Sequence, residues 1–191
     1  GEVNSNIVKE LNKLGAYAVG LSGKDGKLAV AEKRYHLDEE GSKVDLGQVG
    51  NIKSFNTGLI NLLLDNDYIP VVATIAAGED GENYNINADI FAGYLAGAMK
   101  CEKFIMLTDV DGLLKDPNDE ASLLKEITTN DISDLKGKVI KGGMIPKTEA
   151  CETALNGGAS NAYITNGTKP QMLEKLLLND FTETKFTRIT K

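Results

Sequence analysis

The sequence has few of the residues that mark disulfide-stapled or metal-binding proteins. Its 191 residues contain two cysteines, one histidine, four prolines and no tryptophan. Cys101 and Cys151 are too few to staple a chain of this length, and together with His36 they do not form a zinc motif. We therefore expect reduced thiols and assign no metal ligand among the side chains.

Long apolar runs and an excess of positive charge are also absent. The longest run, Tyr68 to Ala77, is about ten residues, whereas a membrane-spanning helix needs about 20. The net charge of −7 disfavours general binding to nucleic-acid phosphates, which depends on clustered lysine and arginine. The N-terminus lacks the basic start and apolar core of a secretory signal. We expect a cytoplasmic protein that binds neither membranes nor nucleic acid.

What the sequence does contain is an alternation of helical and strand patterns. The run at 69–76 is continuously apolar, which is typical of a strand covered on both faces of a parallel sheet. The pattern predicts an α/β fold with an open, mainly parallel sheet covered by helices on both faces. The predicted helices are 4–14, 55–64, 87–100, 145–158 and 169–179, and the predicted strands are 16–22, 27–35, 69–76, 103–110, 159–167 and 184–190.

Several connections can be predicted as well. Asp25-Gly26 is a short-turn signal, so the first two strands are expected to form a hairpin. Residues 37–50 are polar and rich in glycine, which indicates either a surface loop or a second, irregular hairpin. Residues 78–85 are expected to be a loop, and 130–135 a short turn capped by acidic residues. The best candidate for a domain boundary lies around Cys101.

Open α/β sheets bind ligands where their strands end, so the loops after strands are the places to search. The segment KGGMIPK combines two glycines with Lys147 at the start of a helix, which favours phosphate binding. A flexible turn before an amphipathic helix would explain the same residues. There is neither a GxxxxGK[ST] nor a GxGxxG motif, and His36 is interpreted as a surface residue.

The segment NINAD and the segment TDVDG add polar side chains after two further strands. Asn87 is expected to cap a helix, and a carboxylate at Asp89 also favours the helix dipole, so capping alone could explain both. Asn85 could present its amide to a polar ligand. Asp109 and Asp111 could meet a ribose, a metal or solvent. None of these segments is specific by itself.

Taken together and in order, GLSGKDG, IPVVATIA, NINAD, LTDVDGLLKDPND and GGMIPK resemble the amino-acid kinase family, most closely its branch that phosphorylates N-acetyl-L-glutamate. The resemblance reaches a closing FTRI, where Phe186 replaces a family glycine. It implies a carbamate kinase-like fold and transfer of phosphate from ATP, with Mg²⁺, to the side-chain carboxylate of N-acetyl-L-glutamate. The acyl phosphate product belongs to arginine biosynthesis, and the full-length protein would be a homo-oligomer.

The same resemblance implies roles for particular residues. Residues 1–100 would be the remainder of the N-terminal lobe for the amino-acid substrate, and 101–191 the C-terminal nucleotide lobe. Lys147 would stabilise the transferring phosphate and Asp89 would organise the catalytic lysines, while Asn85 and Asn87 would bind the substrate. The implied nucleotide-binding residues are Thr108, Asp109, Val110, Asp111, Gly112, Leu113, Leu114, Val139, Ile140, Lys141, Gly142 and Gly143.

The chain departs from the family at its front. The family's first strand with a catalytic lysine and Gly-Gly, its following glycine-rich loop, and an arginine that grips the substrate are absent. The resemblance thus implies that roughly 70 to 80 residues are missing and that this chain is incomplete, inactive or weakly active. Two alternatives stay open: a relative acting on another carboxylate, and a non-catalytic nucleotide-binding or regulatory module.

Overall fold

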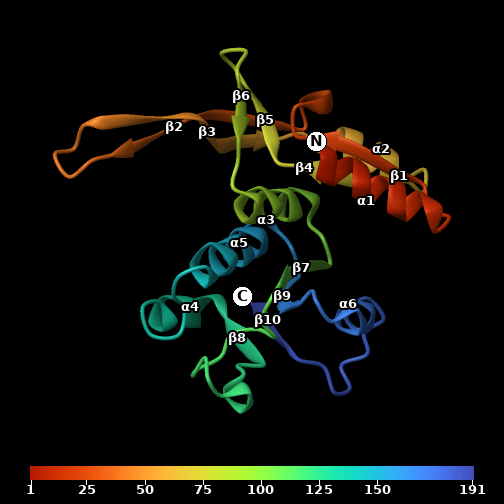
Figure 1. Cartoon of the computed structure of the whole chain (residues 1–191), viewed down its shortest axis with the longest axis vertical. Helices are drawn as coiled ribbons and strands as arrows, with labels where there is room; N and C mark the ends of the chain where they lie inside the picture. The colour runs from red at the N-terminus through yellow and green to blue at the C-terminus, as the bar shows by residue number, and fades with distance from the viewer. The chain divides into compact units, whose positions relative to one another are not determined.

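The computed structural model describes all 191 residues, which form two compact units, Gly1–Phe91 and Ala92–Lys191. The two units are described separately below, and Figure 1 shows the helices and strands of both. The division falls within helix α3 (Ala88–Met99), whereas the sequence places a boundary between residues 100 and 101. Gly93 and Gly97, in the part of α3 that belongs to the second unit, approach α5 (Met144–Gly157) closely.

The first unit contains a two-stranded parallel sheet flanked by two helices. Strand β1 (Ala18–Ser22) pairs with β4 (Ile69–Ala73), and α1 (Glu2–Lys13) and α2 (Gly58–Leu64) pack beside them. The Asn4 side chain fixes α1 to the sheet, since its Nδ2 donates to the carbonyl oxygens of Val71 at 2.7 Å and Leu21 at 3.3 Å. A long-range pairing of this kind confirms the predicted parallel strands.

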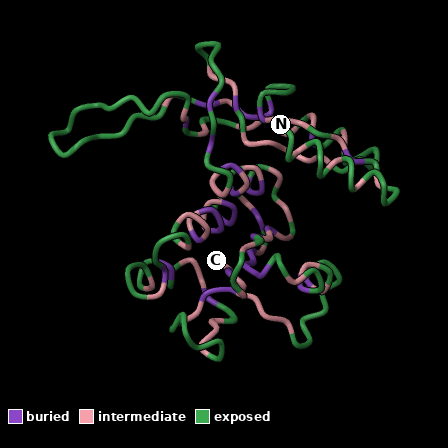
Figure 2. Tube along the Cα trace, in the orientation of Figure 1, coloured by how far each residue is buried: buried purple, intermediate pink, exposed green.

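The other strands of the first unit form a small closed barrel in the order β2-β3-β6-β5. Its longest strands, β2 and β3, pair antiparallel, and their outer part at 34–48 is exposed throughout, drawn in green in Figure 2. The barrel strands are β2 (Ala29–Leu37), β3 (Lys43–Phe55), β5 (Ile75–Gly78) and β6 (Asn83–Asn85).

This arrangement corrects three expectations. The predicted hairpin of the first two strands is wrong, because β1 pairs with β4 and β2 with β3; the Asp25 carboxylate instead closes a 3-10 turn by accepting from the N–H and hydroxyl of Ser22. The single strand 69–76 is divided at Thr74 between the sheet and the barrel, and its first residue is 45% exposed rather than covered. Residues 78–85, expected to be a loop, contain β6. Of the two interpretations of 37–50, the irregular hairpin is confirmed.

The second unit follows the predicted order closely. Its four-stranded sheet has the order β7-β9-β10-β8, with β7 parallel to β9, β10 parallel to β8, and β9 antiparallel to β10. The predicted turn at 130–135 is a helix, because the Thr128 N–H donates to the Asp131 carboxylate in a capping box. The remaining elements are β7 (Lys103–Thr108), β8 (Glu126–Thr128), β9 (Asn161–Asn166), β10 (Phe186–Thr190), α4 (Thr129–Leu135) and α6 (Pro170–Leu177).

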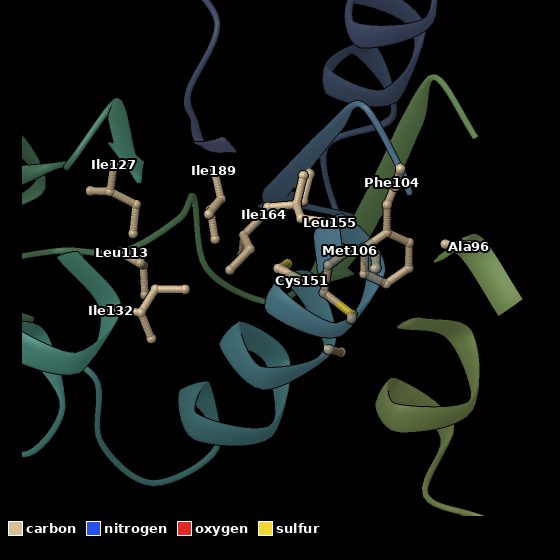
Figure 3. Packing of buried hydrophobic residues seen from close by; sticks show 14 of the residues in the cluster. Ala96, Phe104, Met106, Leu113, Ile127, Ile132, Cys151, Leu155, Ile164 and Ile189 are labelled. Atoms are coloured by element: carbon tan, nitrogen blue, oxygen red, sulfur yellow. The ribbon is translucent and has the colours of Figure 1, made fainter. Parts of the chain in front are cut away.

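The core of the second unit lies between the sheet and α5. Ile164 and Ile189 of the sheet and Leu155 of α5 are fully buried there (Figure 3). Small residues bring α3 unusually close to α5, since a Cβ added at Gly93 would lie 2.5 Å from the carbonyl oxygen of Ala150. The first turn of the buried helix α5 carries residues of the site described below.

The predicted α/β class is confirmed, with parallel strand pairs and packed helices in both units. The sheets are less purely parallel than expected, because the β2–β3 and β5–β6 pairs of the barrel and the β9–β10 pair are antiparallel. No helix has both the length and the apolar character needed to cross a membrane.

Candidate functional site

A cleft of about 740 Å³ lies in the second unit, where β7 ends and α5 begins. Three stretches of chain build it: the segment after β7, the residues before α5, and the first turn of α5. Because β7 ends at this edge of the sheet, the cleft lies where an α/β protein is expected to hold its ligand. Its lining consists of Thr108, Asp109, Val110, Gly112, Leu113, Leu114, Lys115, Asp116, Pro117, Lys138, Val139, Lys141, Gly143, Met144 and Lys147.

Most of the residues with an expected nucleotide role lie around this cleft, and Lys147 lies there with them. Nine of the twelve are part of its lining: Thr108, Asp109, Val110, Gly112, Leu113, Leu114, Val139, Lys141 and Gly143. Two segments separated by about 25 residues of chain therefore meet at one cavity, as expected of a nucleotide site built from both. The binding itself stays a prediction.

The other three expected residues do not line the cleft. Ile140 is fully buried in the core, and its N–H and carbonyl oxygen pair with Leu135 and Gly137. Its side chain therefore belongs to the core and does not line the cleft. Gly142 adopts φ +51° beside open space, which forms the turn into α5. Asp111 lines a separate, smaller hollow.

The cleft is positively charged although the chain is acidic. Four lysines line it against two aspartates, which gives a local excess of two positive charges in a chain of net charge −7. Gly143 lines the cleft and is the N-cap residue of α5, so its N–H group lies at a helix N-terminus. Such a surface favours an anionic ligand of phosphate type.

Sequence reasoning missed five lining residues: Lys115, Asp116, Pro117, Lys138 and Met144. Each lies within three residues of a predicted segment, so extending those segments would have found them. The two lysines carry a signal of their own, because a cation next to a phosphate-binding segment strengthens anion binding.

The first unit holds the three expected residues of the NINAD segment. Asn85 is the exposed last residue of β6, and Asp89 lies in the first turn of α3. The Oδ1 atom of Asn87 accepts the N–H of Ile90 at 3.1 Å, which confirms that Asn87 caps α3. Because Oδ1 is used for capping, Nδ2 is the group of the Asn87 side chain that could bind a ligand. The meeting of Asp89 with Lys147 stays a prediction.

The single histidine and the two cysteines do not line the cleft. His36 lies on the exposed part of β2, as expected of a surface residue. Neither Cys101 nor Cys151 forms a disulfide, and burial raises the pKa of the Cys101 thiol. No three or more His, Cys, Asp or Glu side chains gather where they could hold a metal ion.

Comparison with known proteins identifies the family of the chain. The profile of the amino acid kinase family matches residues 1–166. The acetylglutamate kinase of Methanococcus aeolicus is 45% identical over 187 residues, which are 96% of this chain and 63% of that protein. The acetylglutamate kinase of Methanopyrus kandleri is 46% identical over 167 residues, covering 87% of this chain and 68% of the relative.

A solved structure agrees in fold. The N-acetylglutamate synthase of Neisseria gonorrhoeae, complexed with coenzyme A and N-acetyl-glutamate, has a TM-score of 0.78 at 22% identity and covers all of this chain and 42% of its own. The chain spans slightly less than two thirds of the length of the first curated relatives it matches. The extent of the profile match and the similarity to these relatives show that the chain belongs to the amino acid kinase family.

Proposed function

We propose that the protein to which this chain belongs transfers phosphate from ATP to the side-chain carboxylate of N-acetyl-L-glutamate, giving an acyl phosphate for arginine biosynthesis. The observation that carries the proposal is the lysine-lined cleft, in which Lys147 and the two expected nucleotide segments meet. The name shared by the relatives that are 45% and 46% identical supports the substrate.

Phosphate transfer to a carboxylate requires positive charge in the site rather than a general base. A carboxylate is ionised at neutral pH and can attack directly, so the obstacle is its repulsion from the triphosphate. Two unit charges 4 Å apart repel by about 4 kcal/mol at an effective dielectric constant of 20. Lys147 and the N–H groups of Gly142 and Gly143 would offset this repulsion where charge develops, provided that they hold the phosphate in line with the acceptor.

Mg²⁺ fits this cleft as a companion of the nucleotide. The lining offers two carboxylates, Asp109 and Asp116, rather than a full cage of ligands. That donor set suits Mg²⁺, which usually keeps several waters and is held by one or two carboxylates together with substrate phosphates. When bound, the ion would neutralise phosphate charge.

The proposal assigns the two ligands to different parts of the chain. Residues 1–100 would contribute to the amino-acid substrate lobe through Asn85 and Asn87, and residues 101–191 would form the nucleotide lobe. Asp89 would orient Lys147 through a charge-assisted hydrogen bond. A cytoplasmic location and a homo-oligomeric full-length protein complete the hypothesis.

Two titrations and one variant test this proposal. For the 191 residues alone, calorimetry should detect binding of ATP with Mg²⁺ and little binding of N-acetyl-L-glutamate. In the full-length protein, Lys147→Ala should lower kcat by roughly 10²- to 10³-fold, the usual loss for one preorganised donor. Lys136→Ala is the matched control, because Lys136 pairs with Glu149 outside the cleft lining.

Three results would count against the assignment. Normal turnover of Lys147→Ala would remove Lys147 from the mechanism. Absence of ATP binding would remove the nucleotide role of the cleft. A panel of carboxylates tested on the full-length protein separates N-acetyl-L-glutamate from the substrate of a related kinase, and turnover of none of them would favour a non-catalytic nucleotide-binding module.

A further inference from the structure

The side chain of Asp111 turns away from the lysine-lined cleft, although Val110 and Gly112 on either side line it. The Asp111 carboxylate accepts hydrogen bonds from Lys169 Nζ at 2.7 and 3.0 Å and from Asn166 Nδ2 at 3.0 Å. Its side chain is only 11% exposed. A nearly buried carboxylate with these partners anchors the segment that carries it.

Asn166 extends the same anchor to a second point of the loop 109–114. Its Nδ2 also donates to the carbonyl oxygen of Asp109 at 3.3 Å. Its Oδ1 accepts from the N–H of Thr168 at 3.0 Å and from the Thr168 hydroxyl at 2.6 Å, which fixes the orientation of the amide. The first part of the loop is therefore held from the side opposite the cleft.

A third attachment holds the far end of the loop. Thr187 of β10 accepts the N–H of Leu113 at 2.8 Å, and both residues are buried. Lys169 and Thr187 lie beyond residue 166, where the family match ends. Residues outside the matched region thus hold a loop that lines the candidate nucleotide cleft.

Packing alone does not fix the first part of this loop. A hollow of about 200 Å³ lies on the Asp111 side, and the larger cleft lies on the other. Asp109 and Val110 line both spaces. With space on two sides, the hydrogen bonds to Asp111 and Asp109 decide where the loop lies.

The position of Lys169 supports a specific need for its charge. It is the residue just before Pro170, at the N-terminal end of α6, where a cation is disfavoured by the helix dipole. Its ammonium group nevertheless lies on the Asp111 carboxylate. Lys185 lies 3.6 Å from the same carboxylate but makes its shorter contact, 2.6 Å, with Glu120. Lys169 is therefore the main counter-charge of Asp111.

We propose that Lys169 is a positioning residue for the nucleotide cleft, which acts through Asp111 by holding the loop 109–114 in its binding shape without touching the nucleotide. The inference rests on the proposed nucleotide function of the cleft. If Lys169 is removed, the Asp111 carboxylate keeps only partial compensation from Asn166 and Lys185, and the loop must shift to let water reach the charge.

The test compares four variants of the 191-residue chain: Lys169→Met, Lys169→Arg, Asp111→Asn and the double variant Lys169→Met with Asp111→Asn. Calorimetry with ATP and Mg²⁺ should show roughly tenfold weaker binding for Lys169→Met. A change of this size is within the range of interaction energies measured between residues in contact, here Lys169 and Asp111. Lys169→Arg should restore most of the affinity. Lys53→Met, which breaks the exposed pair of Lys53 with Glu79, is the matched control and should bind normally.

The double variant separates positioning from direct contact. If Lys169 acts through Asp111, neutralising Asp111 removes the stranded charge, and the double variant should recover most of the affinity lost in Lys169→Met. If Lys169 instead contacts the phosphates, the double variant should bind as weakly as Lys169→Met, which would overturn the proposal. Normal binding by Lys169→Met would overturn it equally.

A readout without nucleotide keeps this inference separate from the proposed function. Amide hydrogen exchange at Gly112, Leu113 and Leu114 reports the mobility of the loop in the free chain. Lys169→Met should speed their exchange and the double variant should slow it again. Unchanged exchange in Lys169→Met refutes positioning by Lys169, whereas absence of ATP binding by the unsubstituted chain refutes the nucleotide role alone.

Discussion

The buried hydrogen bond from Leu113 to Thr187 gives the sharpest stability prediction. Thr187→Val keeps the size and branching of the side chain but removes the hydroxyl that accepts the Leu113 N–H at 2.8 Å. Thr187 is fully buried and Leu113 is 1% exposed, so water cannot replace the lost acceptor without opening the core. Leaving a buried donor unpaired costs about 1–3 kcal/mol.

The magnitude can be translated into measurable shifts. For a unit of about 100 residues, each 1 kcal/mol lowers Tm by roughly 4–8 °C. A loss of about 2 kcal/mol at a urea dependence of about 2 kcal/mol per molar lowers the midpoint of unfolding by roughly 1 M. Hydrogen exchange at the Leu113 amide should speed up in parallel, because this N–H loses its only partner.

Thr190→Val is the matched control, because Thr190 lies on the same strand and its hydroxyl makes no such hydrogen bond. Its unfolding midpoint should change little. If Thr187→Val unfolds at the same urea concentration as the unsubstituted chain while the Leu113 amide stays protected, the hydrogen bond does not stabilise the loop and the reasoning fails.

Three further predictions concern other contacts. Gly93→Ala should destabilise the second unit by about 1–3 kcal/mol in urea unfolding, because its Cβ would lie 2.5 Å from the Ala150 carbonyl oxygen; unchanged stability would show that α3 and α5 separate at little cost. Burial alone would raise the pKa of the Asp111 carboxyl, but hydrogen bonds from Lys169 and Asn166 outweigh it and lower the pKa below 3.8. The stabilisation from this group is therefore present above pH 3.8 and lost as the pH falls through the lowered pKa. Asp111→Asn should thus flatten the acid limb of a curve of stability against pH. An acid limb identical to that of the unsubstituted chain would contradict this. Asp89→Asn in the full-length protein should lower kcat much as Lys147→Ala does without unfolding α3, and a normal kcat would exclude Asp89 from catalysis.

The sequence predicted the second unit better than the first. Strands such as 103–108 and 161–166 and the helix at 144–157 have strong apolar patterns and clear ends, so they could be located. In the first unit, β3 is polar and exposed over most of its length and bears no core signal. The wrong partner for β1 arose because a short turn signal says nothing of a strand more than 40 residues away, whose pairing depends on tertiary packing.

For the candidate site, the predictable part was the set of chain segments. Glycines before a helix and aspartates after a buried strand mark where a cleft will form. The direction of each side chain could not be deduced, and Asp111 shows why. Its partners Asn166 and Lys169 are more than 50 residues away, and only the folded sheet brings them to its carboxylate. The same limit hid the core role of Ile140.

The exposed outer half of the β2–β3 hairpin has a practical consequence for handling this protein. Gly41 and Gly47 have open space around them, and the surrounding residues bury no side chain. Proteases cut first at exposed tips of this kind, and inserted peptides are tolerated there best. A fluorophore or an affinity tag placed between Gly41 and Gly47 would thus replace only exposed residues and leave the barrel interior unchanged.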